Sequence, residues 1–166
     1  REKGDNTMGF DLYGLKPQEN TNEPPILLKF QDKDGWVEWD IMSDSDKEEY
    51  FAEKETYNED NPGIYFRNNV WWWRPLWNYV CKNCSDILTD EDVGAGSFND
   101  GHRISKTKSK RIAARLRKLL KNGAVDIEET AYQKEQKSKQ SHYPFEKINI
   151  IEFERFCEQS GGFEIC

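Results

Sequence analysis

The sequence predicts an α+β fold: a small, mainly antiparallel sheet packed by about four helices in a single domain at 8–166. Short apolar runs bounded by Gly, Pro and Asn predict the strands, and stretches with apolar residues three or four positions apart predict the helices. Only 36% of the 166 residues are hydrophobic and 33% are charged. Nine Phe, seven Tyr and six Trp must therefore supply much of the core.

Four segments are expected to form the sheet, at 10–13, 26–41, 64–73 and 163–165. The first contains Phe10 and Leu12 and is closed by Gly14. The second is expected to be a β-hairpin, because two apolar runs flank the tight-turn dipeptide Asp34-Gly35. The last follows two glycines and is expected to return as an edge strand.

Four helices are expected, near 46–58, 75–84, 105–121 and 150–159. Ser45 and Glu48 fit a capping box for the first helix, and Pro75 suits the first turn of the second. Asn149 with Glu152 fits a capping box for the last helix. The polar segment at 126–140 is expected to begin as a helix and to continue as a connection.

The formal net charge is −7, but charge is unevenly distributed. The segment 103–121 holds nine Lys or Arg and no Asp or Glu, which leaves 15 basic and 31 acidic groups elsewhere, a net charge of −16. A basic helix here, N-capped by Ser105, is usually a solvated surface, and contact with nucleic acid is the alternative. The acidic remainder argues against duplex binding by the whole surface.

Four Trp lie within seven residues at 71–77, between Arg67 and Arg74 and after two Asn. Indole and guanidinium groups offer stacking faces, and amides offer a donor and an acceptor, which suits a planar ligand. At least two of these rings are expected in the core, because aliphatic residues are scarce. The residues expected to bind a ligand or partner are Asn68, Asn69, Trp72, Arg74 and Trp77.

A glycine-containing loop ends in Asn99, Asp100, Gly101 and His102, immediately before the basic helix. Free amides and cations at a helix N-terminus favour an anion, so Asn99, Asp100 and His102 join the expected binding residues. The spacing matches neither the dinucleotide fingerprint nor the Walker pattern. His102 beside Asp100 could serve as a general base, although a turn His bonded to backbone is the commoner arrangement.

Four Cys in a chain with no secretory signal indicate free thiols or a metal site rather than disulfides. Cys81, Cys84, Cys157 and Cys166 would make a Cys₄ structural zinc set, but buried free thiols are the first interpretation, so no cofactor is expected. No apolar run is long enough to span a membrane, and a cytoplasmic location is expected. Residues 1–7 precede Met8-Gly9 and are interpreted as an extension or remnant.

The chain contains several long and unusual strings: MGFDLYG from Met8, NPGIYFRNNVWWWRPLW from Asn61, FNDGH from Phe98, the Tyr143-Pro-Phe145 segment and SGGFEIC from Ser160. These strings resemble those of a family of small uncharacterised proteins of bacteriophages and bacteria. Some similar members carry a Cys-rich, zinc-ribbon-like insertion before the Tyr-Pro-Phe segment, where this chain has only QKSKQS. The resemblance implies a phage or phage-derived accessory protein and carries no known activity.

These observations favour a non-enzymatic binding protein that recognises a protein partner or a small planar or anionic ligand. Its surface would join the Trp segment to the loop at 99–102. One alternative is an enzyme acting on a nucleotide or another phosphate-bearing small molecule, with His102 and Asp100 as acid or base. The other is contact with nucleic acid through the basic helix at 103–121.

Overall fold

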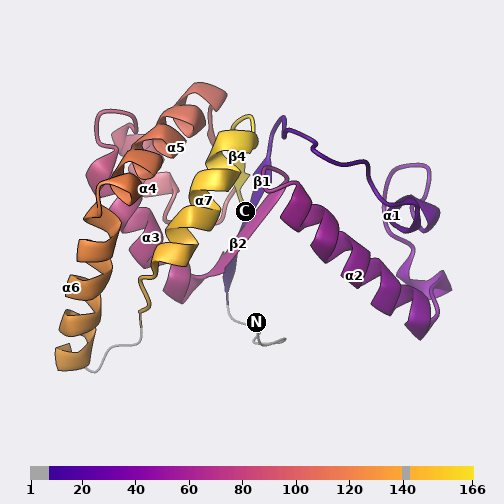
Figure 1. The fold of residues 1–166 in the computed structure, drawn as a ribbon. Coiled ribbons are helices and arrows are strands. Elements are labelled where there is room, and N and C mark those ends of the chain that lie inside the picture. The colour runs from indigo at the N-terminus through magenta and orange to yellow at the C-terminus, as the bar shows by residue number, and fades with distance from the viewer. Residues whose placement is uncertain (1–7, 140–142) are drawn as a thin grey trace.

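The computed structural model describes residues 8–139 and 143–166, and this part of the chain forms seven α-helices, a short 3₁₀ helix and one four-stranded sheet (Figure 1). The predicted α+β class is confirmed. In chain order the elements are β1 (Gly9–Gly14), α1 (Pro25–Lys29), η1 (Trp39–Ile41), α2 (Asp44–Asp60), β2 (Tyr65–Asn69), α3 (Val70–Asn83), α4 (Asp90–Ala95), β3 (His102–Ile104), α5 (Lys106–Lys121), α6 (Ala124–Lys139), α7 (Lys147–Gln159) and β4 (Phe163–Ile165).

The sheet has the order β2-β1-β4-β3, and every neighbouring pair is antiparallel. Leu12 lies opposite Phe66 on one side and Ile165 on the other, and all three side chains are buried. Because alternate residues point to opposite faces, this register gives the sheet one apolar face. Figure 1 shows α3, α5 and α7 on that side of the sheet and α2 on the other.

The core is built mainly from aromatic rings, as the composition predicts. Trp73 is fully buried, with its ring centroid 5.4 Å from that of Phe10 and 5.3 Å from that of Trp77. Phe153 from α7 packs edge-on against Trp73 and also contacts Phe163 of β4. These contacts join α3, α7 and the sheet into one core.

The β-hairpin expected at 26–41 is wrong. Residues 25–29 are helical, and between the two apolar runs the backbone pairs only in an isolated bridge of Gln31 with Val37. The turn at Gly35 is present, with φ of 84°. Pro25 opens the helix at a position where a missing N–H costs nothing. Leu27 and Phe30 then pack with Met42 and Tyr50 in a second, smaller apolar cluster, so these runs never reach the sheet.

The strand expected at 64–73 is too long, and β3 was not expected at all. The second strand ends at Asn69, whose side-chain oxygen accepts from the backbone N–H groups of Trp71 and Trp72, both at 3.1 Å. This N-cap begins α3 at Val70, so the three consecutive Trp are helical. α3 therefore starts five residues before the predicted first turn at Pro75.

Two expected helix caps are also wrong. The capping box of α2 is formed by Ser43 and Asp46 rather than by Ser45 and Glu48. The helix predicted at 150–159 begins at Lys147, with Glu146 as N-cap. The helix of the polar segment extends over the whole range Ala124–Lys139. Within the described ranges, no helix combines the length and apolar character that crossing a membrane requires.

Candidate functional site

The four Trp of the unusual segment divide between the core and the surface. Trp73 and Trp77 are buried, and their indole N–H groups donate to the backbone oxygens of Gly96 (2.8 Å) and Val93 (3.2 Å). Trp71 is exposed and packs edge-on against Tyr143. The expectation of at least two core rings is confirmed, but Trp77 is wrong as a surface binding residue, because a 2% exposed side chain cannot reach a ligand.

The two Asn of the predicted site are used by the fold. The buried amides of Asn68 and Asn149 exchange two hydrogen bonds, at 3.0 and 2.7 Å. Asn69 caps α3. Of the predicted Trp-segment set, only the half-buried Trp72 and the exposed Arg74 remain accessible. The convergence of indole, guanidinium and amide groups expected from the sequence is therefore lost.

His102 does not pair with Asp100, the arrangement considered as an alternative that would make it a general base. The His102 ring lies 3.0 Å from a carboxylate oxygen of Asp92, which is buried and is also bonded by the ammonium group of Lys108. Burial alone would raise the pKa of Asp92, but hydrogen bonds from Lys108, Thr89 and His102 outweigh it and hold that pKa well below its ordinary value. The carboxylate thus fastens β3 and α5 to the N-terminus of α4.

Asn99 and Asp100 lie on the exposed loop between α4 and β3. The amide of Asn99 donates to the backbone oxygen of Gly9 at 3.2 Å, which ties the loop to the start of β1. Neither side chain contacts the Asp92 cluster. The three residues predicted to act together are therefore separated. Asn99 bonds the backbone at β1, Asp100 is exposed to solvent, and His102 belongs to the Asp92 cluster.

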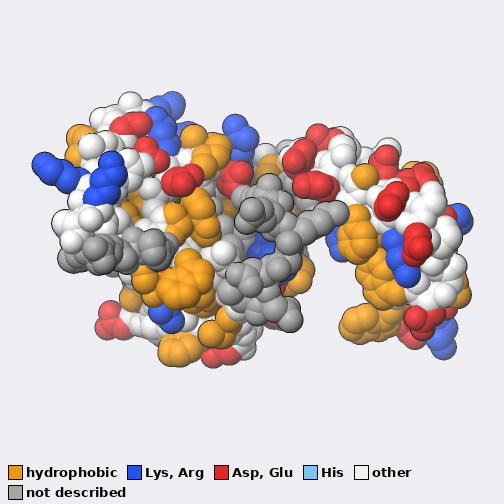
Figure 2. All heavy atoms as spheres, turned by 90° about the horizontal axis from the view of Figure 1, so that it is seen from below, with side chains coloured by type: hydrophobic (Ala, Val, Ile, Leu, Met, Phe, Trp, Pro, Cys, Tyr) orange, Lys and Arg blue, Asp and Glu red, His pale blue; other side chains and the backbone are white. Residues whose placement is uncertain are grey.

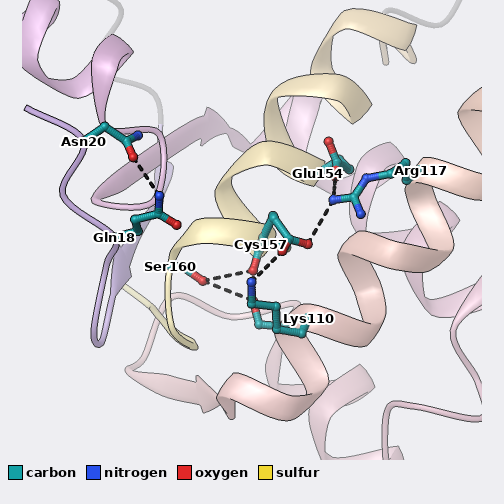
Figure 3. Close-up of polar contacts among 9 residues, drawn as sticks. Gln18, Asn20, Lys110, Arg117, Glu154, Cys157 and Ser160 are labelled. Carbon is teal, nitrogen blue, oxygen red and sulfur yellow. Dashed lines mark hydrogen bonds and ion pairs between the residues drawn. The ribbon is translucent and has the colours of Figure 1, made fainter.

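Most cations of the predicted basic helix are neutralised by neighbouring carboxylates. Lys110 pairs with Glu158, and Arg117 bridges Glu154 and Glu158 of α7 (Figure 3). The other paired cations are Arg103, Lys108, Arg111 and Arg115. Within residues 8–139 and 143–166, Lys106, Lys118 and Lys121 have no ion-pair partner. Six of the nine charges thus stabilise the fold, which weakens the case for nucleic-acid contact.

The four cysteines carry protonated thiols at neutral pH. Burial raises the pKa of Cys81 to about 12 and that of Cys84 to about 11, and it raises the pKa of Cys157 as well. In the described ranges no three His, Cys, Asp or Glu side chains are grouped so that they could hold a metal ion. The zinc set of four thiols considered from the sequence has no counterpart there.

The structure instead presents a second candidate, which sequence reasoning missed. Residues 18–61 form a projecting segment, here called the arm, which contains α1, η1 and α2 and extends away from the main body (Figure 1). The arm holds 14 acidic and 4 basic residues, a net charge of −10, and the rest of the chain holds 17 acidic and 20 basic residues, a net charge of +3. The whole acidic excess of the protein therefore lies on the arm.

The arm also exposes large apolar side chains. Trp36 is 76% exposed and Phe51 is 56% exposed, and the others are Leu28, Trp39 and Ile41. The Trp39 ring stacks on Phe51 with centroids 5.5 Å apart. Figure 2 shows hydrophobic side chains along the edge of the arm that borders an open notch beside the body, and acidic side chains with a few Lys over the rest of the visible arm.

The base of the arm is fixed by one buried side chain, Asn61. Its amide oxygen accepts from the backbone N–H groups of Asn20 (2.6 Å) and Thr21 (3.1 Å), and its amide nitrogen donates to the Thr21 hydroxyl and the Tyr57 backbone oxygen. The Asn20 amide in turn donates to Gln159 at the end of α7. These bonds join both ends of the arm to each other and to the body.

The sheet face opposite α3, α5 and α7 looks toward the arm (Figure 1). Asp11 lies opposite Arg67 on this face, and Tyr13 lies opposite Tyr65. The two Tyr rings are 5.3 Å apart, and the Tyr65 hydroxyl donates to Asp11. Burial raises the pKa of both phenols, so they are neutral. The arm thus borders the notch with an apolar edge, and the sheet carries a tyrosine pair on the face that looks toward the arm.

Comparisons of this chain with protein families, curated proteins and solved structures found no match. The candidate site is an open notch bordered by the apolar edge of a strongly acidic arm.

Proposed function

We propose that this chain is a non-enzymatic accessory protein of the cytoplasm that binds a protein partner through the arm. The observation that supports this most directly is the group of five large apolar side chains exposed on one projecting segment. A single exposed apolar residue is ordinary, but a contiguous apolar patch rimmed by polar groups is typical of an interaction surface. Trp and other aromatic residues supply most of the energy at such surfaces.

The remaining features of the chain fit the same proposal. The resemblance to small bacteriophage and bacterial proteins supports a phage or phage-derived accessory role. Trp72 and Arg74 lie on the body with the exposed Trp71 and would contribute only to a second contact. The pairing of His102 with a carboxylate that already accepts a Lys bond supports a structural role for this histidine rather than acid–base chemistry.

Site-specific cross-linking tests the proposal. Trp36 is replaced by the photo-cross-linking residue p-benzoylphenylalanine, and the full chain is irradiated in bacterial cells. We expect a discrete protein adduct from position 36 that is lost when Phe51→Ser is added. The matched control places the same residue at Phe98, which is 63% exposed but lies on the body. Adducts of equal yield from both positions, or none from position 36, would contradict arm-mediated binding.

A further inference from the structure

The partner's surface can be described from the chemistry of the notch. Resting on the proposed protein-binding function, we infer that the notch takes a polypeptide segment that presents apolar side chains flanked by Lys or Arg. The apolar side chains would pack against Trp39 and Phe51, and the cations would face the carboxylates of α2. Charge complementarity and the unusual exposure of α2 carry this inference.

The acidic residues of the arm are concentrated on α2. α2 alone has eight acidic and two basic residues over Asp44–Asp60, a net charge of −6. Glu48 and Glu55, three and four positions from Phe51 on the same side of α2, are exposed and have no hydrogen bond or ion pair with another described residue. These carboxylates are therefore available to a partner, unlike the cations of α5. Like charges on one helix repel one another, so a cationic partner would also relieve strain within the arm.

α2 packs very few of its side chains against the rest of the protein. Tyr50 is the only buried residue of this 17-residue helix, whose remaining side chains are half-buried or exposed. A long helix that buries almost none of its side chains gains little stability from packing within the protein. Covering Phe51 and its stacked neighbour Trp39 would remove apolar area from water and supply the missing packing.

The same charges disfavour other occupants of the notch. A net charge of −10 on the arm repels nucleic acid and anionic lipid. A second copy of this chain would bring its own acidic arm, and most cations of its α5 are already paired within its fold. A basic and apolar segment of another protein is the occupant that matches both the apolar and the acidic side chains exposed on the arm.

Three labelled amphipathic peptides of equal length test the inference against the intact protein. The first carries Lys on its polar face and Leu on its apolar face, the second replaces Lys by Glu, and the third replaces Leu by Ser. Binding is followed by fluorescence anisotropy at low and high salt. We expect the Lys/Leu peptide to bind at least about tenfold more tightly than either of the others and to weaken as salt rises.

Variants locate the contact on the arm. The combined Trp36→Ser and Phe51→Ser change is expected to weaken the Lys/Leu peptide at least about tenfold, whereas Phe98→Ser on the body leaves it unchanged. Glu48→Gln with Glu55→Gln, the acids three and four positions from Phe51 on the same side of α2, is expected to weaken it severalfold and to reduce its salt dependence. The matched charge control is Glu91→Gln with Asp100→Asn, two exposed acids of the body.

Each remaining outcome overturns the inference in a recognisable way. If the Glu/Leu peptide binds the arm as tightly as the Lys/Leu peptide, the cationic partner is wrong, but binding through the arm stands. If the Lys/Ser peptide binds equally well, the contact is only electrostatic. If no peptide binds, the segment chemistry is wrong, and the cross-linking experiment decides the function separately. Self-association lost in the arm variants would assign the notch to a second copy.

Discussion

The side-chain amides of Asn68 and Asn149 form a closed pair inside the protein, each donating to the oxygen of the other at 3.0 and 2.7 Å. Asn68 comes from β2 and Asn149 from the first turn of α7, and both are almost fully buried. Because a buried amide without a partner pays its full desolvation cost, this pair fixes how α7 sits on the sheet.

A double-mutant cycle tests this pair. Asn68→Ala and Asn149→Ala are each expected to lower the free energy of unfolding by about 1–3 kcal/mol, because each leaves the amide oxygen of the other, buried residue without a donor. The double variant should cost less than the sum of the two, since neither amide then remains. Urea denaturation measures all four proteins. Strictly additive effects would show that the amides do not depend on each other.

Two glycines at the end of α4, Gly94 within the helix and Gly96 at its C-cap, provide a matched pair for the packing of Trp77. A Cβ at Gly96 would lie 2.2 Å from the Trp77 ring, whereas a Cβ at Gly94 has nothing within 4 Å. Gly96→Ala is therefore expected to lower the free energy of unfolding by about 1–3 kcal/mol. Gly94→Ala is expected to be neutral or to stabilise by about 0.4–1 kcal/mol. Equal melting temperatures for the two variants would contradict the close contact at Trp77.

The Asp92 cluster predicts a pH dependence of stability. The pKa of Asp92 is lower in the folded protein than its ordinary value, so the unfolded state binds the proton more readily. The stabilisation is therefore present above the ordinary Asp pKa of about 3.9 and is lost as pH falls below it. Asp92→Asn should flatten the decline of stability between about pH 6 and pH 2.5, while Asp100→Asn on the exposed loop should leave it unchanged. An unaltered pH profile for Asp92→Asn would refute this linkage.

Hydrogen exchange should separate the arm from the body. Only Tyr50 is buried in α2, whereas six residues are buried in α7. In the free protein, amides of α2 after Tyr50 are expected to exchange on the order of a hundredfold faster than those of α7. Mass spectrometry of peptic fragments measures both in one experiment, with α5 as a second protected helix. Equal protection of α2 and α7 would indicate that the arm is already covered.

The general architecture could be predicted from the sequence because its signals are local. The stripe Ile112, Leu116, Leu119 and Leu120 marks α5, and the paired glycines before Phe163 mark the final turn. The hairpin predicted at 26–41 is wrong because its apolar residues pack into a separate cluster around Leu27 and Tyr50 instead of into the sheet. Local pattern does not say which of two cores an apolar run will join.

The candidate site could be predicted only in part. The Trp segment was identified as unusual, but whether an indole at 72 or at 77 faces solvent depends on where α3 begins, and Asn69 sets that point. The acidic character of the arm could be predicted from the sequence, since 14 of the 31 acidic residues fall between 18 and 61. That this segment projects from the body could not be predicted, because its base is held by hydrogen bonds from Asn61 to residues about 40 positions away in the chain.

The division of charge between the arm and the rest of the chain makes the molecule an electric dipole. Its negative pole lies on the projecting helix and its positive pole on the body. In the field of a charged surface such a molecule is turned before it makes contact, so productive encounters are more frequent than random orientation allows. This orienting effect weakens as ionic strength rises, because dissolved ions screen the charges of both poles.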